Sequence, residues 1–173
     1  MGFIKSLLLI SLMAIVLSSA CFIKTNSKID PVLFLIRWIH SMIFLFNLLY
    51  VFMFDKKYDL LYIALFNFMI VHWLFFKNEC ILSYVEKKIM DKNYKLGDEI
   101  FSHPYSDILF DKKIMYILTV TQIFAYMYVS YRFFKNWFPK AMVIVIPVSL
   151  VMMSISTYNF FVPPNKRNWS SIS

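Results

Sequence analysis

Five long apolar blocks divide the amino-acid sequence, at about 6–23, 32–54, 60–76, 114–131 and 141–161. Each block is close to the length of about 20 residues that an α-helix needs to cross the hydrocarbon core of a bilayer. Because lipid offers no hydrogen bonds to the backbone, a segment inside a bilayer must satisfy its own, as a helix does. The blocks therefore predict an all-α, polytopic bundle of five transmembrane helices that forms a single membrane domain over 1–173.

The composition agrees with lipid as the main solvent of this chain. Hydrophobic residues make up 60% of it and charged residues only 16%, against roughly 25% charged residues in a soluble domain. The net charge of +8 comes mostly from lysines between the apolar blocks, where basic residues typically flank membrane spans. We therefore expect the lipid bilayer, and no nucleic acid, as a partner.

The first block allows two interpretations. Lys5, an apolar run over 7–17 and small residues before Cys21 are typical of a signal peptide as well as of a short span. If residues 1–20 are removed as a signal, four spans are left. If they are retained, the bundle has five.

Basic residues are divided unequally between the two ends of the predicted helices. Under the five-span arrangement, the end that holds the N-terminus has six Lys and Arg residues and the other end has eleven. Short loops rich in Lys and Arg usually face the cytoplasm. We therefore predict an outside N-terminus and a cytoplasmic C-terminus, which favours retention of the first helix.

Proline residues mark expected helix boundaries and one irregularity. Asp30 and Pro31 form a helix-starting pair in front of the second block. Pro147 predicts a kink in the fifth helix, and Pro163 and Pro164 predict its end.

The segment 77–113, between the third and fourth blocks, is polar and carries seven basic and seven acidic residues. Within it, apolar residues from Ile81 to Ile89 recur at helical spacing opposite charged ones, which predicts an amphipathic helix on the membrane surface. A simple continuation of the third span is the alternative. We expect this loop to contact other proteins of a membrane assembly, through Glu79, Cys80, Glu86, Lys87, Lys88, Tyr94 and His103.

Three polar residues, Arg37, His40 and Asn47, lie on one face of the predicted second helix. We call them the intramembrane polar stripe. Ionisable groups inside a span are costly and are functional candidates by default. The alternative is that Arg37 extends to the lipid headgroups and that the other two residues hydrogen-bond between helices.

Two further interpretations combine residues of the intramembrane polar stripe with residues of other helices. Antiparallel second and third helices would bring His40 and His72 near the same membrane face, where they could hold a haem in a small redox or ligand-binding bundle. A small channel would use Arg37, Asn47 and Gln122 to line its pore.

Motifs that carry catalysis are not visible in the sequence. It has no G-x-S-x-G elbow, no C-x-x-C pair and no glycine-rich phosphate loop. The residues of the loop that could ligate a metal match no zinc-binding spacing: Glu79, Cys80, Asp98, Glu99 and His103. We therefore expect a protein that is not an enzyme and that holds no cofactor and no metal.

One stretch resembles a known group of proteins. From His72 and Trp73 through Cys80 and Glu86 to Tyr94, the chain is similar to an uncharacterised family of small bacterial membrane proteins with a W-x-H element, then C-P-L-T-x-x-E and a later tyrosine. In this chain Ile81 replaces the proline, Ser83 replaces the threonine and the order of Trp and His is reversed. The resemblance covers about 72–105 and implies a helical bundle with a polar segment between spans, without an assigned reaction.

The composition, rich in Phe, Tyr, Lys, Ile and Asn, is also similar to that of small membrane proteins of large DNA viruses or protist organelles. These observations together favour a non-catalytic, structural or anchoring component of a larger membrane assembly, such as a virion's internal membrane or an organellar complex. The polar segment 77–113 would then provide its contact surface.

Overall fold

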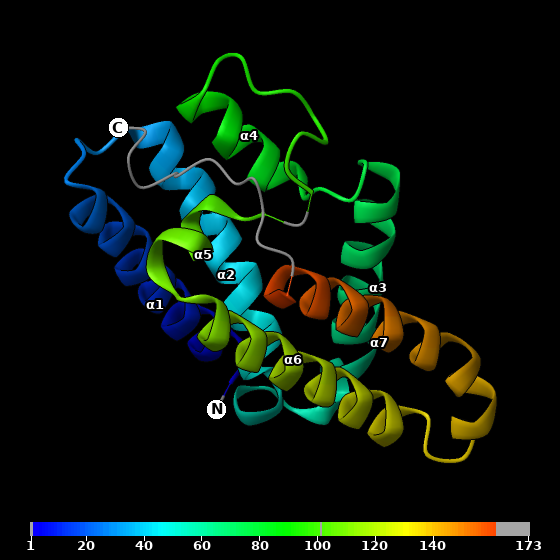
Figure 1. Ribbon diagram of the computed structural model, residues 1–173. Helices are drawn as coiled ribbons and strands as arrows, with labels where there is room; N and C mark the ends of the chain where they lie inside the picture. Colours follow the sequence, from blue (N-terminus) through cyan, green and yellow to red (C-terminus); the bar gives the residue numbers. More distant parts are fainter. Residues whose placement is uncertain (1, 101, 162–173) are drawn as a thin grey trace.

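A computed structural model describes residues 2–100 and 102–161 of the chain, and within these residues the protein is all-helical (Figure 1). The long helices are α1 (Phe3–Thr25), α2 (Pro31–Met53), α3 (Asp59–Phe75), α6 (Lys112–Phe133) and α7 (Phe138–Phe161). Three short ones are the 3-10 helix η1 (Lys56–Tyr58), α4 (Ile81–Met90) and α5 (Pro104–Leu109).

Five of these segments are long and apolar enough to span a membrane, and they correspond to the five apolar blocks of the sequence. The predicted start of the second helix is confirmed: Pro31 is its first residue, and the Asp30 carboxylate accepts a hydrogen bond from the Leu33 N–H at 2.7 Å. Asp111 caps α6 in the same way through the Ile114 N–H, at 2.8 Å. Such side-chain caps satisfy N–H groups that have no partner inside the helix.

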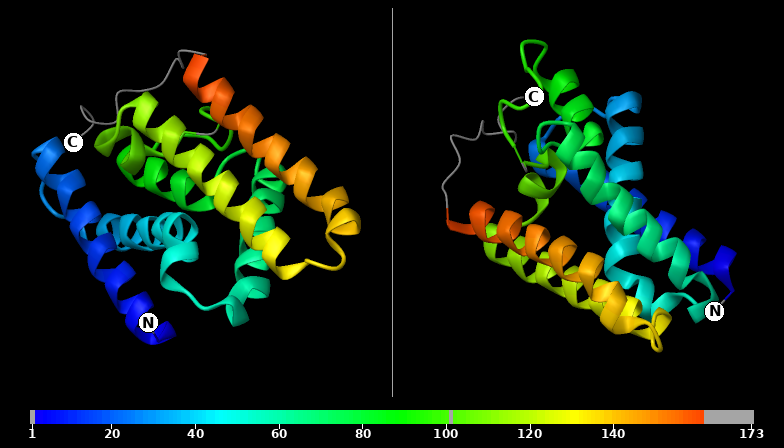
Figure 2. Two further views of the ribbon diagram at one scale, coloured as in Figure 1. Left: turned by 90° about the horizontal axis from the view of Figure 1, so that it is seen from below. Right: turned by 90° about the vertical axis from the view of Figure 1, so that its right-hand side faces the viewer.

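The connecting segments lie at two ends of the bundle (Figure 1). The N-terminal end of α1, η1 and the turn from α6 to α7 share one end, and the polar segment between α3 and α6 caps the other. Helices α6 and α7 run side by side as a hairpin (Figure 2), and α1 packs against α2. This alternation agrees with the five-span arrangement; its orientation in a membrane stays a prediction.

Helices α2 and α3 approach each other at the η1 end and separate toward the other. Near η1 the rings of Tyr50 and Tyr62 stack with their centroids 4.2 Å apart. At the opposite end α4 packs against α2 (Figure 1), and α5 packs against α1 and α4. Helix α6 closes one side of the opening between α2 and α3, because Phe66 of α3 stacks on Tyr126 of α6 at 4.3 Å.

Large apolar side chains cover the outer faces of the long helices. Phe52, Phe68 and Val143 are between 69% and 82% exposed. Exposed apolar area costs roughly 25 cal/mol per Å² in water, so surfaces of this kind are suited to contact with lipid. Proline does not break the fifth helix: α7 continues through Pro147, while Pro163 and Pro164 lie outside the described residues.

The segment between α3 and α6 is folded against the bundle, and we call its residues 77–111 the polar cap. The expected helix is present as α4, and the contact of its apolar face with a membrane surface stays a prediction. Its polar residues Ser83, Glu86 and Lys87 are buried, whereas Ile89 is 38% exposed. The reason is electrostatic: the underlying α2 presents a buried arginine that α4 must neutralise.

Candidate functional site

The polar cap is joined to α2 by a buried ion pair. Arg37 Nε lies 2.8 Å from Glu86 Oε1, and the two side chains are 1% and 0% exposed. The Arg37 guanidinium also lies over the Phe22 ring, 4.8 Å from its centroid, and donates to Met90 Sδ at 3.5 Å. Arg37 therefore points into the cap, where it contacts Glu86, Met90 and Phe22, instead of reaching lipid headgroups.

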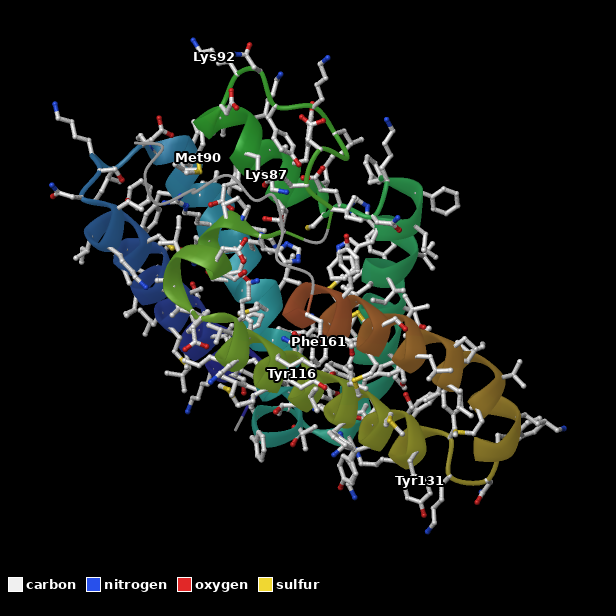
Figure 3. The ribbon with its side chains drawn as sticks, in the orientation of Figure 1. Lys87, Met90, Lys92, Tyr116, Tyr131 and Phe161 are labelled. Atoms are coloured by element: carbon white, nitrogen blue, oxygen red, sulfur yellow. The ribbon has the colours of Figure 1, made fainter. Side chains whose placement is uncertain are left out.

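A second buried cation, Lys87, holds the rest of the cap together. Its Nζ donates to Glu79 Oε1 at 2.6 Å, to the Tyr94 hydroxyl at 3.1 Å and to the Glu99 carbonyl at 2.8 Å. Burial lowers the pKa of Lys87, and the neighbouring Glu79 carboxylate opposes that effect. In Figure 3 Lys87 lies within the cap, whereas Lys92 points away from the molecule.

Glu79 is the acceptor at the centre of this network. Its Oε1 accepts from Tyr94 at 2.7 Å, and its Oε2 accepts from the Gly97 N–H at 2.9 Å. Gly97 has a φ of +92°, and a Cβ added there would lie 3.2 Å from Lys77 Cδ, so a side chain would be strained at this position. The loop 91–99 thus closes over Lys87 as one connected unit.

A third ion pair lies at the opposite end of the bundle. Arg132 of α6 donates to both carboxylate oxygens of Asp59, at the start of α3. The Tyr50 hydroxyl donates to the same carboxylate at 3.0 Å. Sequence reasoning did not pair these two residues, because 73 positions separate them.

Beneath the polar cap, the opening between α2 and α3 contains a cavity of about 1070 Å³. Its walls are mostly apolar and come from α1, α2, α3, the cap, α6 and α7, and they include exposed side chains of α3: Leu61, Leu65 and Phe68. The cavity therefore opens sideways, along the length of the long apolar helices. Its volume lies slightly above the range of about 300–1,000 Å³ that is usual for small-molecule sites.

All three histidines of the chain lie in the wall of this cavity. The ring of His40 is 5.2 Å from that of His103 and 4.5 Å from that of Tyr105. The Nδ1 atom of His103 is 2.5 Å from Ser83 Oγ. Helices α2, α3, α4 and α5 thus bring polar groups to the cap end of an otherwise apolar cavity.

His72 is held by the backbone of the cap. Its Nε2 accepts a hydrogen bond from the Ile81 N–H at 3.1 Å, so this nitrogen is already engaged and does not serve as an axial haem ligand in this arrangement. Among residues 2–100 and 102–161, no group of three or more His, Cys, Asp or Glu is placed to hold a metal ion.

Two buried polar atoms in the cavity wall have no hydrogen-bond partner among the described residues. They are His40 Nδ1 and Asn47 Oδ1, on side chains that are 7% and 4% exposed. The two residues are separated by two turns of α2, about 10 Å along its axis. Leaving such an atom unpaired costs roughly 1–3 kcal/mol, a cost that a bound polar group would remove.

Cys80 also faces the cavity, at the N-terminus of α4. Burial raises the pKa of its thiol, but His40 and the backbone N–H groups of Ser83 and Leu82 outweigh this effect and hold the pKa at about 7. A thiol with this pKa is about half ionised near neutral pH, and the thiolate is the nucleophilic form.

The structure brings part of the predicted site together and separates the rest. The intramembrane polar stripe is buried on one face of α2, with His40 and Asn47 in the cavity and Arg37 in the cap. Gln122 also lines the cavity and donates to the Phe44 carbonyl at 3.2 Å. Of the seven predicted partner-contact residues, four are fully buried and serve the cap itself: Glu79, Glu86, Lys87 and Tyr94.

Sequence reasoning missed two contributors to the cavity. Tyr105 approaches His40 from α5, and Trp73 places its ring 5.6 Å from that of His103. Aromatic residues are 20% of this chain, so nothing local distinguished these two. The separation of 30 residues or more from their partners hid the contacts.

Comparison of the chain with protein-family models, with curated proteins and with solved structures finds no match. The partial resemblance over 72–105 therefore stays a prediction.

Proposed function

We propose that this protein binds the fatty-acyl chain of a lipid in the cavity between α2, α3, α6 and α7. One observation carries the proposal. Two buried atoms in the wall of a mostly apolar cavity, His40 Nδ1 and Asn47 Oδ1, have no hydrogen-bond partner among the described residues. Large apolar pockets with a few convergent polar groups are the usual sites of ligand binding. This function belongs to the class of ligand-binding membrane bundles that the histidines already indicated.

The shape of the cavity supports a lipid as its occupant. Leu65 and Phe68 both line the cavity and are 46% and 69% exposed on the outer face of α3. An acyl chain in the surrounding bilayer would meet a continuous apolar path from this face into the cavity. The polar end, under the cap, is suited to the carbonyl or carboxyl group at the head of such a chain, because His40 and His103 lie there.

Photo-crosslinking tests this proposal. The purified protein in nanodiscs is irradiated with a palmitate analogue that carries a diazirine and an alkyne, and modified peptides are identified by mass spectrometry. Crosslinks should concentrate on cavity residues of α2 and α3 and should decrease with unlabelled palmitate. Labelling that is spread over all lipid-facing helices and is not displaced would contradict the proposal.

Two leucines of α3 provide a matched pair of variants. Leu65 lines the cavity, whereas Leu74 is 60% exposed and lies outside it. Leu65→Trp should reduce crosslinking at α2 by at least fivefold because the indole enters the cavity. Leu74→Trp, the same change on the same helix, should leave the crosslinking unchanged.

A second candidate function is a non-catalytic structural component of a membrane assembly, with the outer surface of the cap as its contact site. It is favoured by the charged side chains that this surface exposes: Lys88, Lys92, Lys95 and Asp98. Charge reversal by Lys92→Glu with Lys95→Glu should then abolish co-purification of a native membrane partner while insertion is retained. Unchanged recovery of the partner would refute a contact through these lysines.

A further inference from the structure

Cys80 occupies a position in which its sulfur can act as a nucleophile toward a molecule in the cavity. It precedes the first residue of the ten-residue helix α4, its side chain is partly buried, and it lines the cavity. The Leu82 and Ser83 N–H groups stabilise the thiolate, as N–H groups at helix N-termini do.

A second, independent feature lies beside this cysteine. His40 is 7% exposed and lines the same cavity, and its Nδ1 has no hydrogen-bond partner among the described residues. The imidazole also lowers the pKa of the Cys80 thiol. A cysteine paired with a histidine is the general arrangement of an activated thiol nucleophile.

The other cysteine of the chain provides an internal comparison. Cys21 is 0% exposed, donates to the Tyr105 carbonyl at 3.6 Å and does not line the cavity. The two thiols therefore differ in access to the cavity, although both lie near the cap end of the bundle.

We infer that Cys80 is a site of S-acylation, which accepts a long-chain acyl group from an acyl thioester whose chain occupies the cavity. The inference rests on the proposed acyl-binding function of this cavity. The Cys80 thiolate attacks the carbonyl carbon, forms a new C–S bond, and the bond from that carbon to the donor sulfur breaks. The donor leaves as a thiolate, which takes up the proton that His40 removed from the Cys80 thiol. One thioester replaces another, so no oxidant or reductant is needed.

The test uses a long-chain acyl-coenzyme A with a terminal alkyne as the acyl donor and the intact protein in nanodiscs. After reaction, a fluorophore is attached to the alkyne and the signal is measured before and after neutral hydroxylamine, which cleaves thioesters. Wild-type protein and the Cys21→Ser variant should be labelled alike, and hydroxylamine should remove the label. The Cys80→Ser variant should lose at least nine-tenths of the signal.

Two further measurements separate an organised site from background chemistry. Native wild-type protein should react at least tenfold faster than the same protein denatured in SDS, and His40→Gln should slow the native reaction at least tenfold. Equal rates for native and denatured protein, or equal labelling of Cys80→Ser and wild type, would overturn the inference.

The diazirine-palmitate crosslinks distinguish this inference from the proposed function. If wild type gives displaceable cavity crosslinks and forms the thioester, whereas Cys80→Ser forms no thioester, both are supported. Cavity crosslinks in wild type without any thioester would overturn S-acylation and leave acyl binding intact. Absence of displaceable cavity crosslinks would overturn the proposed function itself.

Discussion

Arg37 of α2 and Glu86 of α4 form an ion pair in which neither side chain is more than 1% exposed. This pair fixes the polar cap over the end of the cavity, because α4 continues from Glu86 back to Cys80 in the cavity wall. The position of the proposed nucleophile therefore depends on a charge pair six residues away from it.

Removal of one member of this pair should be strongly destabilising. Glu86→Leu leaves the Arg37 guanidinium buried without its carboxylate, which typically costs about 3–5 kcal/mol. Thermal unfolding in detergent, followed by size-exclusion chromatography, measures the loss.

The double variant Arg37→Met with Glu86→Leu removes both charges and should recover most of the lost stability, because two apolar side chains can replace a buried pair. Lys92→Gln, on the exposed side of the cap, is the control and should have no effect. A double variant less stable than Glu86→Leu alone would contradict this account of the pair.

Lys87 should control the order of the loop 91–99. Lys87→Met leaves Glu79 and the Glu99 carbonyl without their shared donor, so the loop should open more often. Limited trypsin digestion should cut after Lys92 and Lys95 at least tenfold faster than in wild type. Lys92→Met, which changes an exposed lysine of the same cap, should leave cleavage after Lys95 unchanged.

The reactivity of Cys80 should rise with pH around neutrality. Its thiol has a pKa of about 7, and only the thiolate reacts with iodoacetamide, so the rate should rise about tenfold from pH 6 to pH 8. The titratable groups around the thiol are His40 of α2, His72 of α3, and His103, Tyr105 and Asp107 of the cap.

Mass spectrometry of each cysteine peptide against time provides the pH profile. Cys21 is the internal control and should stay unmodified, because its side chain is 0% exposed. A rate that keeps rising steeply above pH 8, as for an ordinary thiol with a pKa near 8.5, would contradict the stabilising role of His40.

The third ion pair, between Asp59 and Arg132, should secure the other end of the bundle. Asp59→Asn removes the charge that Arg132 and the Tyr50 hydroxyl share, so the thermal midpoint in detergent should fall by several degrees. Asp55→Asn changes an exposed acid in the same connection and should not change it. Equal midpoints for the two variants would show that the Asp59 pair adds nothing to stability.

The helices of this fold were predictable because their signal is local. A block of apolar residues long enough to cross a bilayer predicts a span without reference to the rest of the chain, and the Asp30–Pro31 pair marked the start of α2 at the observed residue. The intramembrane polar stripe followed in the same way from helical spacing alone.

The burial of Glu86 on the protein side of α4 was not predictable, because it depends on a residue 49 positions earlier. The sequence of α4 by itself predicts an amphipathic helix whose apolar face lies on a membrane. The buried Arg37 explains why Glu86 faces the protein, and the contact of the apolar face with a membrane stays a prediction. The cavity was not predictable from the sequence either, because it arises from the distance between α2 and α3.

The central claim, that an acyl chain enters the cavity, is tested most directly by fluorescence quenching of Trp73, which lines the cavity and is 8% exposed. The measurement compares a variant with Trp73 as its only tryptophan and one with only Trp137, which is 64% exposed and outside the cavity. Both are titrated in nanodiscs with brominated stearic acid. Trp73 should be quenched saturably near one equivalent and recover with unlabelled stearate, while Trp137 quenching should increase only in proportion to total brominated lipid. Parallel, non-saturating quenching of both tryptophans would contradict the claim.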